Sequence, residues 1–87
     1  MNLSKNASAY SEAEIDDELV LLNIATGQFH GLRGVGLAIW KLLDSEPDLA
    51  AIKAILSDRF AVDPSTCTRE VDQFISELEK ARLLVVT

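Results

Sequence analysis

The fold is decided by residues 19–32, which read LVLLNIATGQFHGL. Residues 19–24 form a short apolar run bounded by turn residues, which predicts a strand that is covered on most of its surface. Residues 25–27 predict a short hairpin loop, because Gly27 can take the positive φ that such loops need. Residues 28–32 then predict the partner strand.

The chain before this hairpin predicts a first, weaker strand. Residues 7–12 alternate small or aromatic residues with polar ones, which is typical of a strand. Five carboxylates and no basic residue lie between Glu12 and Glu18. Their mutual repulsion predicts a solvated turn over residues 14–17. The three strands predict an antiparallel meander, and we expect residues 1–6 to be disordered.

After the hairpin the apolar spacing changes from a period of two to a period of 3.6, which indicates helices. A first helix is predicted by one stripe of residues, namely Val35, Ala38, Ile39, Leu42 and Leu43. Residues 44–47 should end this helix, because the residue before a proline is disfavoured in the helical region. Trp40 in the same helix is expected to be a core anchor.

Two further helices and an apolar tail follow. Asp48 is well placed as the N-cap of a second helix, whose apolar face extends from Leu49 to Phe60. Asp63 followed by proline is a strong start signal for a third helix, over residues 64–82. Residues 83–86 are expected to pack under the body.

These elements predict a single α+β domain over residues 1–87, of winged helix-turn-helix type. In that fold class, a three-stranded antiparallel meander is followed by a three-helix bundle. Neither the helices nor a small sheet would be stable without burying their apolar faces against one another.

Composition excludes several classes of function. Eight Lys and Arg oppose fourteen Asp and Glu, for a net charge of −6. That balance disfavours nucleic acid as a partner, because phosphate contacts need basic side chains. No signal peptide and no membrane span are apparent, so we expect no membrane partner. A single cysteine excludes a disulfide framework within the chain and fits a cytoplasmic location.

The sequence offers few groups for catalysis, so we expect no enzyme, no metal and no cofactor. His30 and Cys67 have no ligand spacing between them, and each is more simply explained as a packed residue. The acidic run lacks the spacing of a calcium loop. Glycines 31, 34 and 36 match no phosphate-binding fingerprint.

The predicted third helix also disfavours DNA recognition. Its basic residues are outnumbered, and the surface carries a net charge of −1 from Arg69, Glu70, Asp72, Glu77, Glu79, Lys80 and Arg82. A DNA-reading surface is expected to be basic instead.

The series of spacings resembles the PqqD-like family, whose members are also called RiPP recognition elements. (RiPPs are ribosomally made, post-translationally modified peptides.) Over about residues 7–86, the matching features are the run 21–32, Gly36 to Trp40, Leu42-Leu43, Leu49, Ile52, Leu56, Phe60 to Asp63, Glu70-Val71, Phe74-Ile75, Leu78 and Leu83-Leu84. The family usually has Asn where this chain has Arg33. A side-chain cap is therefore missing, and we expect the first helix to start one or two residues later or to fray.

The resemblance implies a non-catalytic protein that binds the leader segment of a precursor peptide as an added β-strand. The groove would lie between the third strand and the third helix. A separate modifying enzyme or leader peptidase would be the second partner, and the lasso-peptide type is favoured. The implied leader-binding residues are Gln28, Phe29, His30, Gly31, Leu32, Arg69, Glu70, Gln73, Phe74, Glu77 and Leu78.

Three alternatives stay open. The chain could be a PqqD-type chaperone for a radical enzyme in quinone-cofactor synthesis. It could also be an acidic winged-helix interaction or regulatory module. An apolar edge groove is, in addition, what an oligomerisation surface would present.

Overall fold

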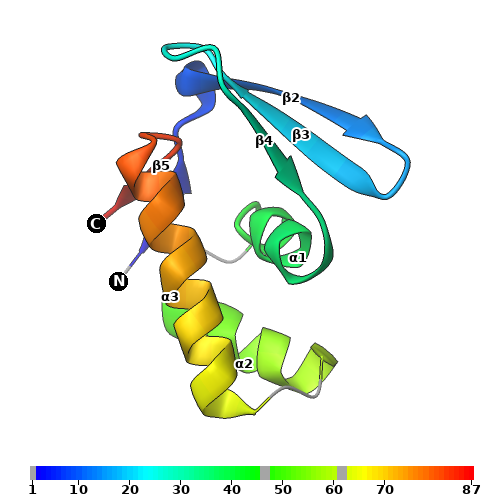
Figure 1. Ribbon diagram of the computed structural model, residues 1–87. Coiled ribbons are helices and arrows are strands. Elements are labelled where there is room, and N and C mark those ends of the chain that lie inside the picture. The colour runs from blue at the N-terminus through cyan, green and yellow to red at the C-terminus, as the bar shows by residue number, and fades with distance from the viewer. Residues whose placement is uncertain (1, 46–47, 61–62) are drawn as a thin grey trace.

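The computed structural model describes residues 2–45, 48–60 and 63–87. A three-stranded antiparallel sheet lies on one side of the molecule, with α1 beneath it, and the three helices pack against one another (Figure 1). The sheet has the order β2-β3-β4, and a second, two-stranded sheet joins β1 to β5. In chain order the elements are β1 (Leu3–Lys5), a 3-10 turn (Ala7–Ala9), β2 (Tyr10–Ile15), β3 (Glu18–Asn23), β4 (Phe29–Leu32), α1 (Gly34–Leu42), α2 (Leu49–Phe60), α3 (Pro64–Lys80) and β5 (Leu84–Val86).

The α+β architecture predicted from the sequence is confirmed, with a meander before three helices. The winged helix-turn-helix assignment stays a prediction. Residues 46–47 of the expected helix stop and residues 61–62 of the connection to the third helix lie outside the described residues.

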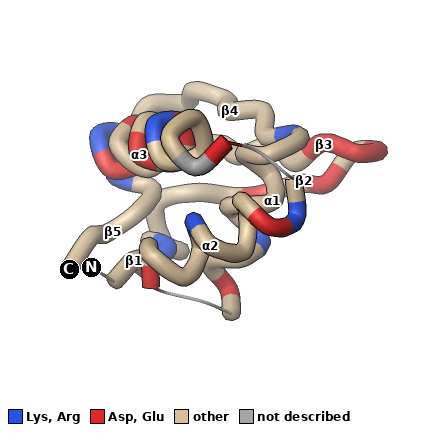
Figure 2. The backbone as a smooth tube through the Cα atoms, turned by 90° about the horizontal axis from the view of Figure 1, so that it is seen from below, with Lys and Arg blue, Asp and Glu red and all other residues tan. Residues whose placement is uncertain are grey.

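Several boundaries differ from the expectation, and the hairpin strands predicted at residues 19–24 and 28–32 are Glu18–Asn23 and Phe29–Leu32. The first meander strand covers Tyr10–Ile15 instead of residues 7–12, and residues 7–9 form a 3-10 turn. The acidic turn is therefore confined to Asp16 and Asp17, which are exposed. They lie at the projecting tip of the β2–β3 hairpin, where acidic residues gather along the backbone (Figure 2). The pairing of β2 with β3 continues out to Ile15 and Glu18, so the repulsion among the carboxylates does not prevent the two strands from pairing.

The third helix ends at Lys80, two residues earlier than expected. Arg82 adopts a left-handed conformation with φ of 62°. The amide of Leu83 donates to the carbonyl of Leu78 at 3.0 Å, and the amide of Arg82 donates to that of Glu79. This pattern is a helix-ending motif that turns the chain out of α3 and into β5.

The expectation that residues 1–6 are disordered is wrong for the described residues 2–6. β1 pairs with β5 in antiparallel register, from Leu3 opposite Val86 to Lys5 opposite Leu84. Leu3 is only 3% exposed and belongs to the hydrophobic core. The tail was expected to pack under the body, and Leu83 and Leu84 are indeed buried. The two ends of the chain therefore stabilise each other.

Trp40 is a core anchor, as expected, and it joins three elements. Its side chain is 1% exposed, and its indole Nε1 donates to Glu12 Oε2 in β2 at 2.9 Å. The Tyr10 ring meets it edge to face at 5.1 Å, and Lys5 Nζ lies 4.2 Å from its centroid. Burial, together with the nearby carboxylates of Glu12 and Asp44, raises the pKa of Tyr10 above its ordinary value.

Helix α1 begins at Gly34, directly after Arg33, so the expected delay is not found. The expected lack of a side-chain cap at Arg33 is confirmed. Gly34 has φ of 60°, a conformation that glycine adopts without steric cost. This residue lets the chain leave β4 and enter the helix without a capping oxygen.

The first prediction tests the terminal sheet. Leu3→Ala should lower the free energy of unfolding by about 2–4 kcal/mol, because it removes a buried side chain from the core. The control Ser4→Ala changes an exposed position of the same strand and should stay within about 0.5 kcal/mol of wild type. Urea denaturation of the three proteins measures both, and equal stability of the two variants would contradict the role of β1.

The second prediction concerns the N-cap of α3. Hydrogen bonds from the Ser65 hydroxyl and the Thr66 amide lower the pKa of Asp63 below its ordinary value of 3.8. A carboxylate with a depressed pKa stabilises the fold above its unfolded pKa and loses that contribution as the pH falls through its folded pKa. The stability difference between wild type and Asp63→Asn should therefore shrink as the pH is lowered below about 4.

Chemical denaturation between pH 2 and pH 7 measures this difference. Asp58→Asn is the control, because it removes the same charge from an exposed position inside α2. A difference between wild type and Asp63→Asn that stayed constant over the whole pH range would contradict the prediction.

Candidate functional site

Strand β4 forms an edge of the three-stranded sheet, because β3 is its sole neighbour in the strand order. The amide of Asn23 donates to the carbonyl of Gln28 at 2.8 Å. In an antiparallel ladder, hydrogen-bonded and non-hydrogen-bonded pairs alternate. His30 and Leu32 therefore pair with β3 through their main chains, and the main-chain groups of Phe29 and Gly31 point to the free edge.

The side chains of β4 alternate between the two faces of the sheet. His30 and Leu32 face inward, and Leu32 is part of the core. Phe29 faces outward and is 71% exposed. Along the strand, Phe29 and Gly31 therefore present main-chain groups to the free edge, and His30 and Leu32 present side chains to the inner face.

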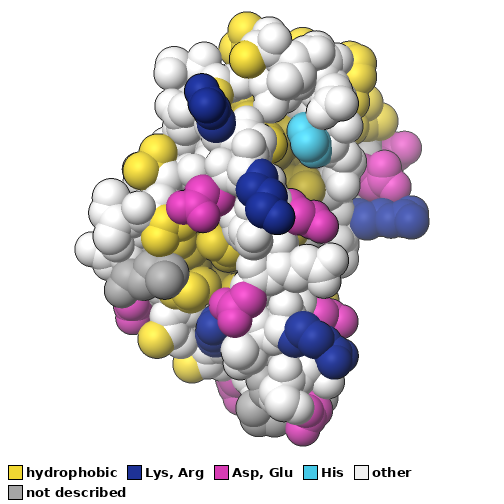
Figure 3. Space-filling model, turned by 60° about the vertical axis from the view of Figure 1, so that its left-hand side comes forward, with side chains coloured by type: hydrophobic (Ala, Val, Ile, Leu, Met, Phe, Trp, Pro, Cys, Tyr) yellow, Lys and Arg dark blue, Asp and Glu magenta, His cyan; other side chains and the backbone are white. Residues whose placement is uncertain are grey.

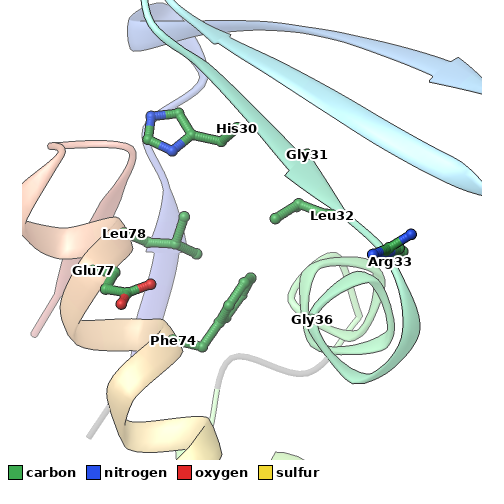
Figure 4. Close-up of a pocket in the computed structure, with 8 residues that line it drawn as sticks. All are labelled: His30, Gly31, Leu32, Arg33, Gly36, Phe74, Glu77 and Leu78. Carbon is green, nitrogen blue, oxygen red and sulfur yellow. The ribbon is translucent and has the colours of Figure 1, made fainter.

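A groove lies between this edge and α3. It has a volume of about 540 Å³ and is lined by His30, Gly31, Leu32, Arg33, Gly36, Phe74, Glu77 and Leu78. Figure 4 shows Leu32 on one wall with Phe74 and Leu78 facing it from α3. Figure 3 shows the same face with hydrophobic side chains beside the imidazole, and charged side chains around them. The groove is therefore apolar inside and polar at its rim.

Gly36 sets the width of the groove at its α1 end. A Cβ atom built on this glycine would lie 3.2 Å from Cε2 of Phe74, which is tighter than an ordinary contact. A side chain at this position would require the Phe74 ring to shift by a few tenths of an ångström. Arg33 lies at the same end, where its guanidinium pairs with Glu18 Oε1 at 3.3 Å.

Asn23 fixes the position of the β3–β4 hairpin relative to the end of α3. Asn23 is 3% exposed, and its Nδ2 donates to the carbonyl of Ala81, just past α3, at 3.0 Å. Its Oδ1 accepts from the amides of Ala25 and Thr26 in the hairpin loop. One side chain thus ties the β3–β4 hairpin to the end of α3.

The structure brings six of the predicted site residues together in the groove: His30, Gly31, Leu32, Phe74, Glu77 and Leu78. Five others do not line it, namely Gln28, Phe29, Arg69, Glu70 and Gln73. Gln73 Nε2 donates to Glu77 Oε1 at 3.5 Å and so lies beside the rim. Arg69 and Glu70 are exposed residues in the half of α3 that precedes the groove-lining turns.

Sequence reasoning missed three residues that shape the site. Arg33 and Gly36 line the groove, and Asn23 positions its walls. The signal for Arg33 was its place directly after the edge strand, and the signal for Gly36 was its place in the first turn of the helix that follows. Asn23 was visible as a polar residue within an otherwise apolar strand.

The described residues contain no group of three or more His, Cys, Asp or Glu side chains that could hold a metal ion. Cys67 is buried on α3, where its Sγ lies 3.8 Å from the carbonyl of Lys53. Its environment is that of a small core residue. Within the part of the chain that is described, no helix is long and apolar enough to cross a bilayer.

The fold and groove define a small α+β domain with an open strand edge beside an apolar helix face. A family model described as "Coenzyme PQQ synthesis protein D (PqqD)" matches residues 18–84, so the chain belongs to the PqqD family. Among solved structures, TbiB1 in complex with the TbiA(beta) leader peptide is similar, with 34% sequence identity and a TM-score of 0.81. That match covers 100% of this chain and 98% of TbiB1. No curated protein matches the chain.

The third prediction tests the tie between the hairpin and α3. Asn23→Ala should lower the free energy of unfolding by about 1–3 kcal/mol, because it leaves the Ala81 carbonyl and two loop amides without their partner. Gln28→Ala, at an exposed position of the same hairpin, should change it by less than about 0.5 kcal/mol. Urea denaturation compares the two, and a stability of Asn23→Ala equal to that of the control would contradict the role given to this amide.

Proposed function

We infer that this protein binds the leader segment of a precursor peptide as a strand added to the free edge of β4. The observation that carries this function is the coincidence of an open main-chain edge at Phe29 and Gly31 with an apolar groove in front of it. The similarity to TbiB1, which was solved with a leader peptide, supports the same interpretation.

Different parts of the site would supply the affinity and the specificity for the peptide. Main-chain groups of Phe29 and Gly31 would pair with the peptide backbone, which any sequence without proline can provide. Side chains on alternate residues of the peptide would enter the groove between β4 and α3 and contact Leu32, Phe74 and Leu78. Phe29 would contribute through its main chain, since its side chain faces the other side of the sheet.

The protein would be non-catalytic and would deliver its bound peptide to a separate modifying enzyme or leader peptidase, of the lasso-peptide type. A peptide on the β4 edge leaves the outer face of the meander free, where Ile15 and Phe29 are exposed. Tethering of this kind raises the effective concentration of the precursor at the enzyme. The alternative is a partnership with a radical enzyme of quinone-cofactor synthesis, which the description of the matching family favours.

Isothermal titration calorimetry tests the function directly. The probes are the TbiA(beta) leader peptide and the leader half of any short precursor encoded beside this chain. Saturable binding of either peptide is expected. No binding of either, together with saturable binding of duplex DNA at low salt, would overturn the proposed function.

A proline scan of the bound peptide tests strand addition. Proline at residues that pair with Phe29 or Gly31 removes a ladder hydrogen bond and should abolish binding. Proline at the intervening residues removes an amide that points away from β4 and should be tolerated better. A loss of affinity that does not alternate along the peptide would contradict this mode of binding.

The fourth prediction concerns a substitution that narrows the groove without unfolding the domain. Gly36→Ala should weaken peptide binding about fivefold or more, because the new methyl group displaces the Phe74 ring, and overpacking has costs of this size. Its free energy of unfolding should change little, since alanine favours the helix by about 1 kcal/mol over glycine and offsets the strain.

Ala54→Ser is the control, because it also adds one heavy atom to a helix, at an exposed position of α2 that does not line the groove. Its binding should stay within about twofold of wild type, because a surface substitution away from the site has a small effect. Equal affinities of the two variants would contradict the position of the groove.

A further inference from the structure

One residue that lines the groove, His30, carries a buried ring nitrogen without a hydrogen-bond partner. Nε2 of His30 is buried and has no hydrogen-bond partner, and it is the one such side-chain atom among the described residues that are not exposed. His30 lines the groove beside Glu77 and Leu78. The missing partner of Nε2 bears on the tautomer of the ring, because few buried N–H groups in proteins are left without an acceptor.

The position of the ring decides which nitrogen can act. Figure 4 shows one ring nitrogen turned toward Leu78 and the groove, and the other turned away from it. The nitrogen next to the ring carbon that carries the side chain is Nδ1, and this is the one that faces the groove. Buried amide-type hydrogens without an acceptor are rarer than buried acceptors without a donor. The neutral tautomer with its proton on Nδ1 therefore fits the site, and it aims an N–H donor into the groove.

An added strand would place a defined residue opposite this donor. If a peptide pairs with the main chains of Phe29 and Gly31, the residues opposite His30 and Leu32 project to the same inner face. These two residues are separated by one position in the peptide. One would meet the Nδ1–H of His30, and the other would pack between Leu32 and Phe74.

The charge of the groove restricts the first of these two residues. The Glu77 carboxylate lines the same hollow and would repel a carboxylate from the peptide. Arg33 lies at the far end, next to Leu32, and is paired with Glu18. A neutral oxygen acceptor, such as a hydroxyl or a carboxamide, can accept from Nδ1–H and donate to Glu77.

We propose that His30 is a specificity-determining residue, which selects a leader side chain with a neutral oxygen acceptor two positions away from an apolar anchor. The inference rests on the proposed function and names the chemistry of its ligand. It predicts a polar-x-apolar or apolar-x-polar pattern in the leader, with Ser, Thr, Tyr, Asn or Gln as the polar residue.

A displayed library of random 16-residue peptides tests this selection, because it does not depend on knowing the leader. The library is selected against wild type, His30→Phe and His30→Asn. Phe keeps the ring and removes both nitrogens, and Asn places an amide donor near the position of Nδ1. Thermal unfolding checks that each variant is folded, and His30→Leu replaces His30→Phe if that variant is not.

Wild type and His30→Asn should enrich the neutral polar residue at one position, and His30→Phe should enrich an apolar residue there. For one enriched peptide, replacing Thr by Val, or the equivalent isostere, should weaken binding to wild type about three- to tenfold. The same change should alter binding to His30→Phe by less than about twofold, as expected when both partners are apolar.

Two failures are distinguishable. If wild type and His30→Phe bind peptides with the same preference at every position, the role of His30 is overturned and leader binding stands. If wild type enriches no peptide and does not bind the TbiA(beta) leader peptide, the proposed function is overturned and this inference falls with it.

Discussion

The site depends on one buried amide. Asn23 lies at the end of β3, and its Nδ2 holds the Ala81 carbonyl at 3.0 Å while its Oδ1 accepts from two loop amides. This contact joins the hairpin to the end of α3, and it therefore fixes where β4 lies relative to α3. This satisfied polar residue in the core therefore fixes where the two walls of the groove begin. Such residues are costly to leave unpaired, which makes the arrangement specific.

The second constraint is the period of two along β4. Adjacent residues have different tasks, because Phe29 and Gly31 expose main-chain groups at the edge and His30 and Leu32 expose side chains in the groove. A surface of this type can bind many peptide backbones and still discriminate between side chains. The helix supplies the other wall through Phe74 and Leu78, and Gly36 leaves the Phe74 ring room to stand against α1.

Local patterns predicted much of this structure. The hairpin of β3 and β4 and the three helices follow from apolar periodicity, turn residues and caps, all of which act over a few neighbouring positions. The groove-lining residues Phe74 and Leu78 were implied by the resemblance to the PqqD-like family. The prediction of disorder was wrong for residues 2–6 because β1 is stabilised by β5, at the other end of the chain. A pairing over that separation leaves no local signal in a strand as short as Leu3–Lys5.

The sequence by itself determined the fold class and the resemblance to the PqqD family, because hydrophobic period and turn chemistry are properties of short segments. The resemblance in turn implied which two elements form the groove. Only the tertiary structure decided that Arg33 and Gly36 line the groove, that Phe29 faces away from it, and that Asn23 joins the hairpin to α3. These facts depend on register and on contacts between distant segments, and a one-residue change of register would move each β4 side chain to the other face.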